Sequence, residues 1–127
     1  MIRSHWRAGP QEAWTGQVFV SVTDFTSSRV LDLPGIALAG YGLRRGWATL
    51  DGAVGMWLWT KPARRRSGSV SVWTSAAALS GFVRWPPHVR IMKKYRTRGR
   101  IAAHNWHADE FDQGLVWRAA LARLNQA

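Results

Sequence analysis

Four histidines are the residues of this chain whose charge depends most on their surroundings, and His88 has the most unusual setting. It follows two prolines in "WPPHVRIMKKYR", where Pro87 suits the first turn of a helix. A helix dipole lowers the pKa of a histidine near the helix N-terminus and keeps the imidazole neutral. We therefore expect His88 either to bind iron or accept a proton, or to satisfy backbone groups at a break between two helices.

The segment "HNWH" places His104 and His107 three residues apart. On a strand these two side chains point to opposite faces, so a shared metal requires the strand to end between them, with Asp109 or Asp112 as a third ligand. Alternatively, His104 lines a pocket beside Trp106 and takes part in proton transfer there. A structural histidine with satisfied ring nitrogens is the third interpretation.

Nine tryptophans in 127 residues indicate a large aromatic core, an interface or a pocket for a flat ligand. Trp57 and Trp59 lie two residues apart and share one face of a predicted strand. If that face meets helices, the two rings can stack on a bound ligand, and otherwise they belong to the core or to an interface. Asn105 and Tyr41 are candidates for polar contacts to the same ligand.

The chain is strongly basic, with 18 Lys and Arg against seven Asp and Glu and a formal net charge of +11. Such a charge favours anionic partners. Single-stranded nucleic acid is one, although no recognition motif for nucleic acid is present. Alternatively, a few bases such as Arg90 and Lys94 pair with the carboxylates of a ligand, while the rest keep the protein soluble.

Length and composition restrict the class of protein. A chain of 127 residues suits one domain, which we divide into a core over residues 17–108 and a C-terminal helix over 109–127. The absence of cysteine excludes disulfides and cysteine-ligated metals. Neither a signal segment nor an apolar run long enough to span a membrane occurs, so we expect a cytoplasmic protein.

The hydrophobic pattern predicts four strands, over residues 18–23, 53–60, 69–73 and 99–109. One helix begins at Asp32 and Pro34, a second begins after Ser75 and breaks at the prolines, and a third follows Asp112. Gly40 and Gly42 interrupt the first helix, which indicates either close packing on the sheet or space for a ligand.

This β-α-β-β-α-β order is typical of the α+β, ferredoxin-like split βαβ architecture, a four-stranded antiparallel sheet with two helices on one face. The second face of the sheet is also apolar, so it must be covered. We expect the same face of a second subunit to cover it in a homodimer.

Several segments resemble one superfamily: "SVWTSAAALSGFV", "LPG" at the first helix, "PPHVRIM" and "AAHNW". They are similar to the dimeric α/β-barrel proteins that include antibiotic-biosynthesis monooxygenases and heme-degrading monooxygenases. The resemblance covers about residues 17–108 and is closest to the branch around spheroidene monooxygenase.

The resemblance implies a pocket between sheet and helices that holds an apolar polycyclic substrate or a heme. The Trp and His of heme-degrading members fall at Phe82 and Met92 here, which counts against heme degradation. His88 matches a histidine of the spheroidene-monooxygenase-like branch and is the candidate axial ligand. A monooxygenase-like function follows, with a non-catalytic ligand-binding module of the same fold as the alternative.

Overall fold

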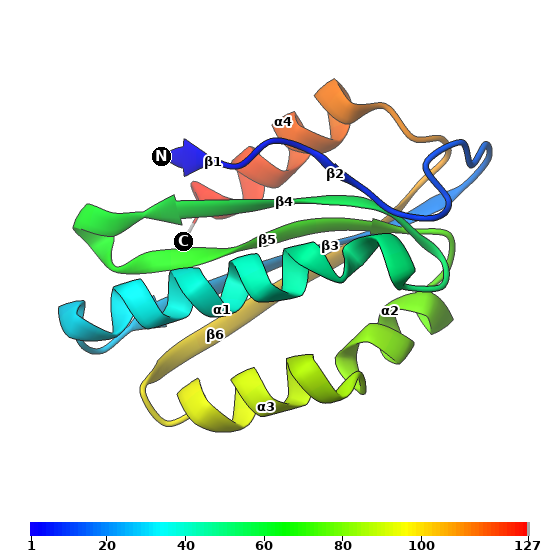
Figure 1. Cartoon of the computed structure of the whole chain (residues 1–127). Coiled ribbons are helices and arrows are strands. Elements are labelled where there is room, and N and C mark those ends of the chain that lie inside the picture. The colour runs from blue at the N-terminus through cyan, green and yellow to red at the C-terminus, as the bar shows by residue number, and fades with distance from the viewer. Residues whose placement is uncertain (127) are drawn as a thin grey trace.

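A computed structural model describes residues 1–126, and all its strands form one antiparallel sheet (Figure 1). The strands are β1 (Ile2–Arg3), β2 (Arg7–Ala8), β3 (Val18–Ser27), β4 (Ala53–Lys61), β5 (Arg66–Trp73) and β6 (Gly99–Ala108). Their order is β1-β4-β5-β3-β6, and β2 also pairs with β4. The helices are α1 (Leu33–Arg45), α2 (Ala76–Val83), α3 (Pro86–Tyr95) and α4 (Gln113–Leu124), and the short 3-10 helices are η1 (Val30–Asp32), η2 (Trp47–Thr49) and η3 (Pro62–Arg64).

The predicted β-α-β-β-α-β order is confirmed, and the fold is ferredoxin-like α+β. The first long strand, β3, lies in the middle of the sheet, where Phe19 is in register with Trp73 of β5 and with His107 of β6. The predicted break in the second helix is also present, because α2 ends at Val83 and α3 begins at Pro86.

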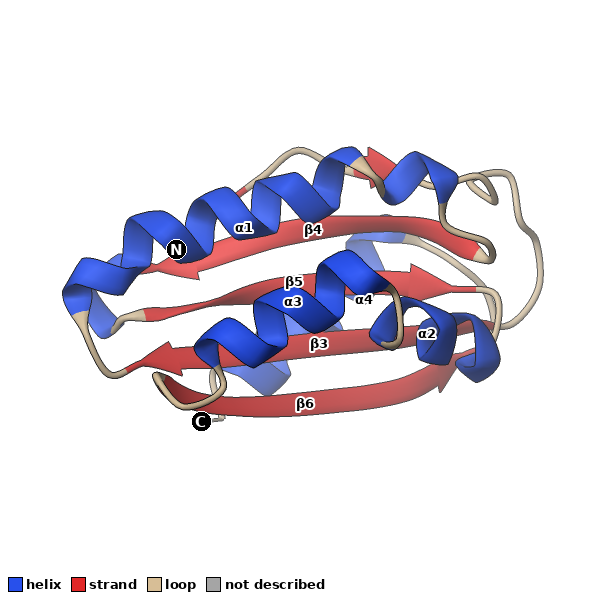
Figure 2. Cartoon of the chain, turned by 60° about the horizontal axis from the view of Figure 1, so that its bottom comes forward, coloured by secondary structure: helices blue, strands red, loops and turns tan. Residues whose placement is uncertain are grey.

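Helices α1, α2 and α3 cover one face of the sheet (Figure 2). Their core contains Trp47, Met56 and Trp73, and Ser75 caps α2 by accepting a hydrogen bond from the Ala78 N–H at 3.2 Å. Asp32 does not cap α1 as expected. Its carboxylate instead pairs with Arg98 at 3.2 Å, which ties the start of α1 to the turn before β6.

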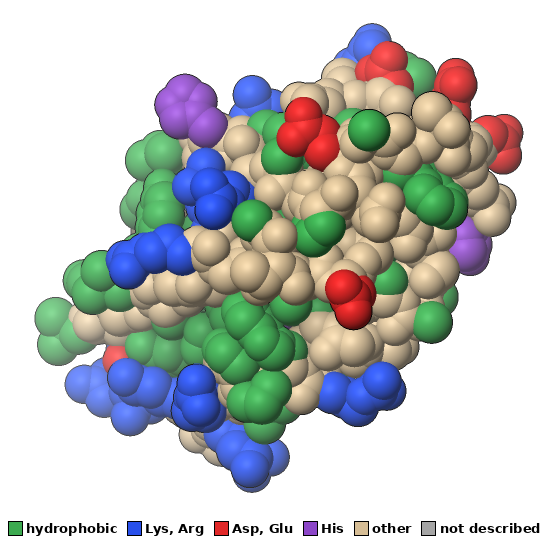
Figure 3. Space-filling model, turned by 45° about the vertical axis from the view of Figure 1, so that its right-hand side comes forward, with side chains coloured by type: hydrophobic (Ala, Val, Ile, Leu, Met, Phe, Trp, Pro, Cys, Tyr) green, Lys and Arg blue, Asp and Glu red, His purple; other side chains and the backbone are tan. Residues whose placement is uncertain are grey.

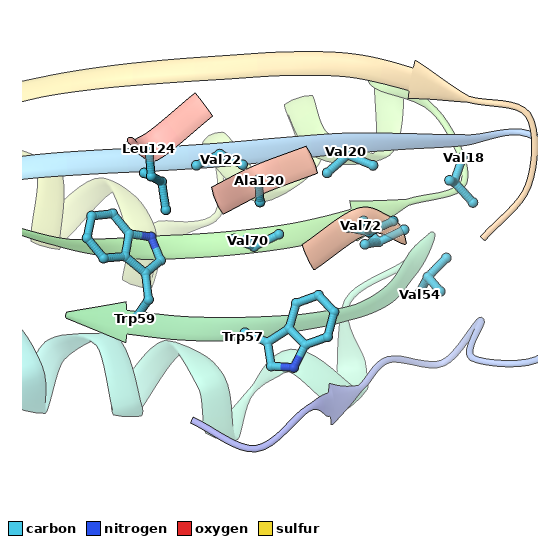
Figure 4. Close-up of a cluster of buried hydrophobic side chains, with 11 residues drawn as sticks. Val18, Val20, Val22, Val54, Trp57, Trp59, Val70, Val72, Ala120 and Leu124 are labelled. Atoms are coloured by element: carbon cyan, nitrogen blue, oxygen red, sulfur yellow. The ribbon is translucent and has the colours of Figure 1, made fainter. Parts of the chain in front are cut away.

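The opposite face of the sheet is covered by α4 of the same chain, so the expected bare face does not exist (Figure 4). Inward-facing valines of β3 and β5, together with Trp57 and Trp59, pack against Val116, Ala120 and Leu124. Asp112 begins α4 by accepting a hydrogen bond from the Leu115 N–H at 3.0 Å. The apolar sheet face that predicted a second subunit is therefore covered by a helix of the same chain.

The N-terminal residues add an edge to the sheet for which no element was predicted. Strands β1 and β2 both pair with β4. Between them the Trp6 ring lies directly on Gly55, where a Cβ atom would overlap it, and stacks on Phe111 at a centroid distance of 5.2 Å. The absence of a side chain at Gly55 therefore leaves the space that the Trp6 ring occupies on β4.

The two glycines of α1 have different surroundings. A Cβ at Gly40 would make an ordinary contact with Leu58 of β4 at 3.5 Å, so this glycine faces the sheet but is not required by close packing. Gly42 has no atom near its Cβ position. Within residues 1–126, no helix is both long and apolar enough to cross a membrane.

Candidate functional site

A groove of about 400 Å³ runs between α1 and α3, on the outer side of the layer that these helices form over the sheet. Its lining residues are Gly35, Leu38, Ala39, Arg90, Ile91, Lys94 and Tyr95. Most of this lining is apolar, and the two cations belong to α3. The groove is open to solvent, and its apolar walls lie beside a few charged groups.

The groove depends on the close approach of Gly35 and Tyr95. A Cβ at Gly35 would lie 2.6 Å from the Tyr95 hydroxyl oxygen, so glycine leaves room for that hydroxyl group. Tyr95 is 7% exposed and lies between the two helices, with the Lys94 ammonium 5.4 Å from its ring centroid. The predicted ligand contacts Arg90 and Lys94 are thereby brought to one surface, and both side chains are exposed.

His88 lies on α3, one turn before Ile91, and its first role follows from the prolines. In a continuous helix the Val83 carbonyl would accept a hydrogen bond from the N–H of residue 87, but Pro87 has none. The Nδ1 atom of His88 lies 3.1 Å from this carbonyl oxygen instead. His88 therefore satisfies the backbone group that the helix break leaves without a partner.

This contact also determines which ring nitrogen carries the proton. A carbonyl oxygen only accepts, so Nδ1 must be the donor, and in the neutral imidazole Nε2 is then an acceptor. Burial lowers the pKa of His88 from its ordinary value of 6.5, and the hydrogen bond to Val83 opposes part of that shift. The cause is desolvation, whereas the sequence suggested the helix dipole. A neutral His88 with a basic Nε2 results.

An aromatic cluster fills the space between His88 and the sheet. The Phe82 ring lies 4.5 Å from the His88 ring, 4.9 Å from Trp47 and 5.4 Å from Trp73, measured between centroids. These contacts leave no room for a porphyrin on the sheet side of His88. The residues present therefore do not fit the expected heme there.

Of the predicted site residues, the structure brings only Arg90 and Lys94 to the lining of this groove, and His88 lies one turn before Ile91 without lining it. Trp57 and Trp59 are 3% and 2% exposed and lie in the core under α4, on the opposite face of the sheet from α1 and α3. Trp106 shares that face and carries the Arg123 guanidinium 3.7 Å above its ring. A tryptophan-lined pocket between sheet and helices, as predicted, is therefore not what these residues form.

The remaining candidates are distributed over both faces. His104 is in register with Val22 on the sheet face that α4 covers. Asn105 is in register with Ser21 on the opposite face, which α1, α2 and α3 cover. Tyr41 is exposed on α1, with the Arg44 guanidinium 6.0 Å from its ring. His107 pairs in register with Phe19, so the two histidines of "HNWH" point apart, and residues 1–126 contain no group of three side chains placed to hold a metal ion.

Tyr95 and Gly35 are the site residues that sequence reasoning did not select. Tyr95 follows His88 by seven residues, so the helical period places the two side chains on the same side of α3. Gly35 carries no such signal, because its role depends on the distance between two helices that are about 60 residues apart in the chain. Such a distance is a tertiary property.

Comparisons with known proteins support the fold. No family model and no curated protein matches the chain, whereas solved structures do. A protein described provisionally as an antibiotic biosynthesis monooxygenase from Caulobacter crescentus is 10% identical, with a TM-score of 0.61 over 80% of this chain and 97% of that one. SnoaB, a cofactor-independent oxygenase from Streptomyces nogalater, is 16% identical, with a TM-score of 0.54 over 72% and 92%.

A dimeric ferredoxin-like protein of unknown function from Jannaschia sp. is 17% identical, with a TM-score of 0.60 over 70% of this chain and 97% of that one. At these identities the likeness concerns the fold, and it does not distinguish the branch around spheroidene monooxygenase. The chain therefore has the ferredoxin-like fold that this dimeric protein and the monooxygenase-like structures share.

Proposed function

We propose that the protein is a monooxygenase-like enzyme that binds an apolar, polycyclic aromatic acid in the groove between α1 and α3. The observation that carries the proposal is the groove itself, in which apolar walls and the buried Tyr95 meet the cations Arg90 and Lys94. A flat apolar body suits the walls, and a carboxylate suits the cations. The fold shared with a cofactor-independent oxygenase supports an oxygen reaction.

His88 supplies the proposed proton transfer. Its Nδ1 is held by the Val83 carbonyl, which leaves Nε2 as the acceptor of the ring, and burial lowers the pKa of His88 and so keeps the ring unprotonated at pH 7. His88 lies one turn before Ile91 on α3 and does not line the groove, so the proposal requires the substrate to extend past Ile91 to reach it. An activated CH₂ group of the substrate gives its proton to Nε2, and O₂ then oxidises the resulting carbanion. The CH₂ group becomes a ketone and one water is released, so no additional reductant is needed.

A homodimer is the second part of the proposal, supported by the dimeric ferredoxin-like structure. Because α4 covers the sheet face, we place the contact at β6 instead. This strand forms an edge of the sheet, and its residues Ile101, Ala102 and Ala103 are exposed. Long exposed edge strands readily pair with another chain.

The test uses anthraquinone-2-carboxylate as a binding probe, titrated into the protein and followed by calorimetry. We expect saturable binding that Lys94→Gln or Arg90→Gln weakens about tenfold each, because a charge-assisted contact to the carboxylate is lost. Lys93→Gln is the matched control, since Lys93 is exposed on the same helix and does not line the groove. Equal weakening by Lys93→Gln would show that only net charge attracts the probe.

The reaction is tested separately with dithranol, an anthrone with an activated CH₂ group, by measuring O₂ uptake and formation of the anthraquinone. We expect a rate above the spontaneous one that His88→Asn abolishes, because asparagine retains a donor for Val83 but cannot act as the base. Probe binding without any rate enhancement would contradict the enzyme and favour the alternative, a non-catalytic binding module of the same fold.

A further inference from the structure

A second and larger groove, of about 890 Å³, lies on the α4 face of the sheet, where β3 ends and β5 and β6 begin. Four arginines line it: Arg64, Arg65, Arg66 and Arg100. Arg66 of β5 and Arg100 of β6 are both in register with Thr26 of β3. The two arginines therefore lie on the two strands that flank β3, at the same level of the sheet. We call this surface the arginine groove.

One carboxylate, that of Asp24, lies in the arginine groove, and it is already neutralised. The Arg66 guanidinium binds it through Nε at 3.1 Å and Nη2 at 2.6 Å, and Nη2 also donates to the Leu124 carbonyl at 2.8 Å. The side chains of Arg66 and Asp24 are 12% and 5% exposed. This internal pair balances one positive charge, so three guanidinium groups in the groove have no counter-charge among its lining residues.

The loop that carries these arginines is held in a defined shape. Arg65 has φ of 54°, a left-handed conformation that usually favours glycine or asparagine. Two hydrogen bonds hold it to the end of β3: the Ser27 N–H donates to the Arg65 carbonyl at 2.8 Å, and Arg65 Nε donates to the Ser27 carbonyl at 2.9 Å. Backbone strain kept at a charged loop is typical of binding positions.

We infer that the arginine groove binds an anion with two or more linked phosphate groups. Guanidinium groups bind phosphate oxygens through paired N–H donors, and three of them at one site match more than one phosphate. Arg64 and Arg100 make no side-chain hydrogen bond within the described part of the chain, so both have free donors for this ligand. The site lies on the other face of the sheet from the α1–α3 groove and does not depend on ligand binding there. It shares Ile101 and Ala102 with the β6 edge at which we place the dimer contact.

The chemistry favours a compact polyphosphate over single-stranded nucleic acid. Proteins that bind single strands place aromatic side chains beside the basic groove so that bases can stack on them. The lining of the arginine groove contains no aromatic residue. Its positive charge is also concentrated at one end of the sheet, which suits a short ligand with closely spaced charges.

The test is calorimetric titration with inorganic triphosphate at 0.15 M salt. We expect one saturable site, weakened about tenfold by Arg64→Gln and about tenfold by Arg100→Gln, because each removes charged hydrogen bonds to phosphate. Both side chains are exposed, so these variants should fold, and thermal unfolding verifies this. Arg84→Gln, at an exposed position after α2, is the matched control.

Two outcomes would overturn the inference. Absence of saturable binding, or equal weakening by Arg84→Gln, would show that triphosphate responds only to the net charge of +11. A twelve-nucleotide oligothymidine that binds more tightly than triphosphate, with the same dependence on Arg64 and Arg100, would assign the groove to nucleic acid. Binding of anthraquinone-2-carboxylate should be unchanged in Arg64→Gln, which separates this result from the fate of the α1–α3 groove.

Discussion

At the scale of single residues, His88 makes a structural contact through one ring nitrogen and keeps the other as a hydrogen-bond acceptor. Its Nδ1 replaces the hydrogen bond that Pro87 cannot make, and its Nε2 remains available. Removing the side chain in His88→Ala leaves the Val83 carbonyl without this partner, which should cost about 1 to 2 kcal/mol of unfolding free energy. A loss of activity in that variant alone would therefore be ambiguous, which is why asparagine is the informative replacement.

The lowered pKa of His88 predicts a pH dependence of stability. The unfolded chain takes up a proton near pH 6.5, whereas the folded chain resists it, so the contribution is fully present above pH 6.5 and is lost as the pH falls through the folded value. We expect His88→Asn to lose less unfolding free energy than the native protein between pH 7.5 and pH 5, measured by urea unfolding. His5→Asn, at an exposed N-terminal position, should lose as much as the native protein. Identical losses in native protein and His88→Asn would contradict the prediction.

At the scale of the elements, two glycines differ in whether a neighbouring side chain occupies the position of their missing Cβ atom. Gly42 is exposed in α1 with open space at its Cβ position, whereas Gly55 of β4 lies under the Trp6 ring. The same substitution should therefore have opposite effects at the two positions.

Gly42→Ala should raise the free energy of unfolding by about 0.5 to 1 kcal/mol, because alanine restricts the unfolded chain and suits a helix interior. Gly55→Ala should lower it by about 1 to 3 kcal/mol, because the new methyl group displaces the Trp6 ring. Both are measured by urea unfolding. A destabilising Gly42→Ala would contradict the first prediction.

The elements also show how far the sequence predicts this structure. Alternation of apolar residues located the four long strands, and Ser75 and Pro87 located the helix ends, because those signals are local. Alternation states which residues share a face but not which helices cover that face. Trp57 and Trp59 were correctly paired with each other, yet only tertiary packing places them under α4.

Other features were not predictable for different physical reasons. Strands β1 and β2 have two residues each, too few to show a period. The α1–α3 groove depends on a glycine–tyrosine contact between distant segments, and the arginine groove gathers residues from three strands and a loop. The basic composition predicted anionic partners but not the place where they bind.

At the scale of the whole molecule, charge is unevenly distributed. In Figure 3, most of the visible acidic side chains lie in the upper part of the face, whereas basic ones occur in both parts and many lie along the lower edge, on the side where Figure 1 places α2 and α3. Two copies with a net charge of +11 each repel one another at long range. Salt screens this repulsion, with a Debye length of about 10 Å at 0.1 M and about 3 Å at 1 M.

The proposed homodimer should therefore become more populated as salt increases. We expect light scattering to show a mass nearer to twice 14.3 kDa at 1 M salt than at 0.1 M. Ile101→Lys should shift the mass toward the monomer, because a charged residue on an edge strand opposes pairing. Leu115→Lys, at another exposed apolar position, should not. A monomeric mass at every salt concentration would contradict the dimer.

The central position of β3 also determines when the protein can fold during its synthesis. Phe19 is synthesised early, but its register partners Trp73 and His107 are synthesised much later. The Trp6 ring likewise cannot stack on Phe111 until that residue has been synthesised. Contacts between such distant positions form slowly. Strand β3 can pair with β5 once Trp73 has been made, but its other edge stays unpaired until β6 is complete, and an unpaired strand edge makes a nascent chain prone to aggregation.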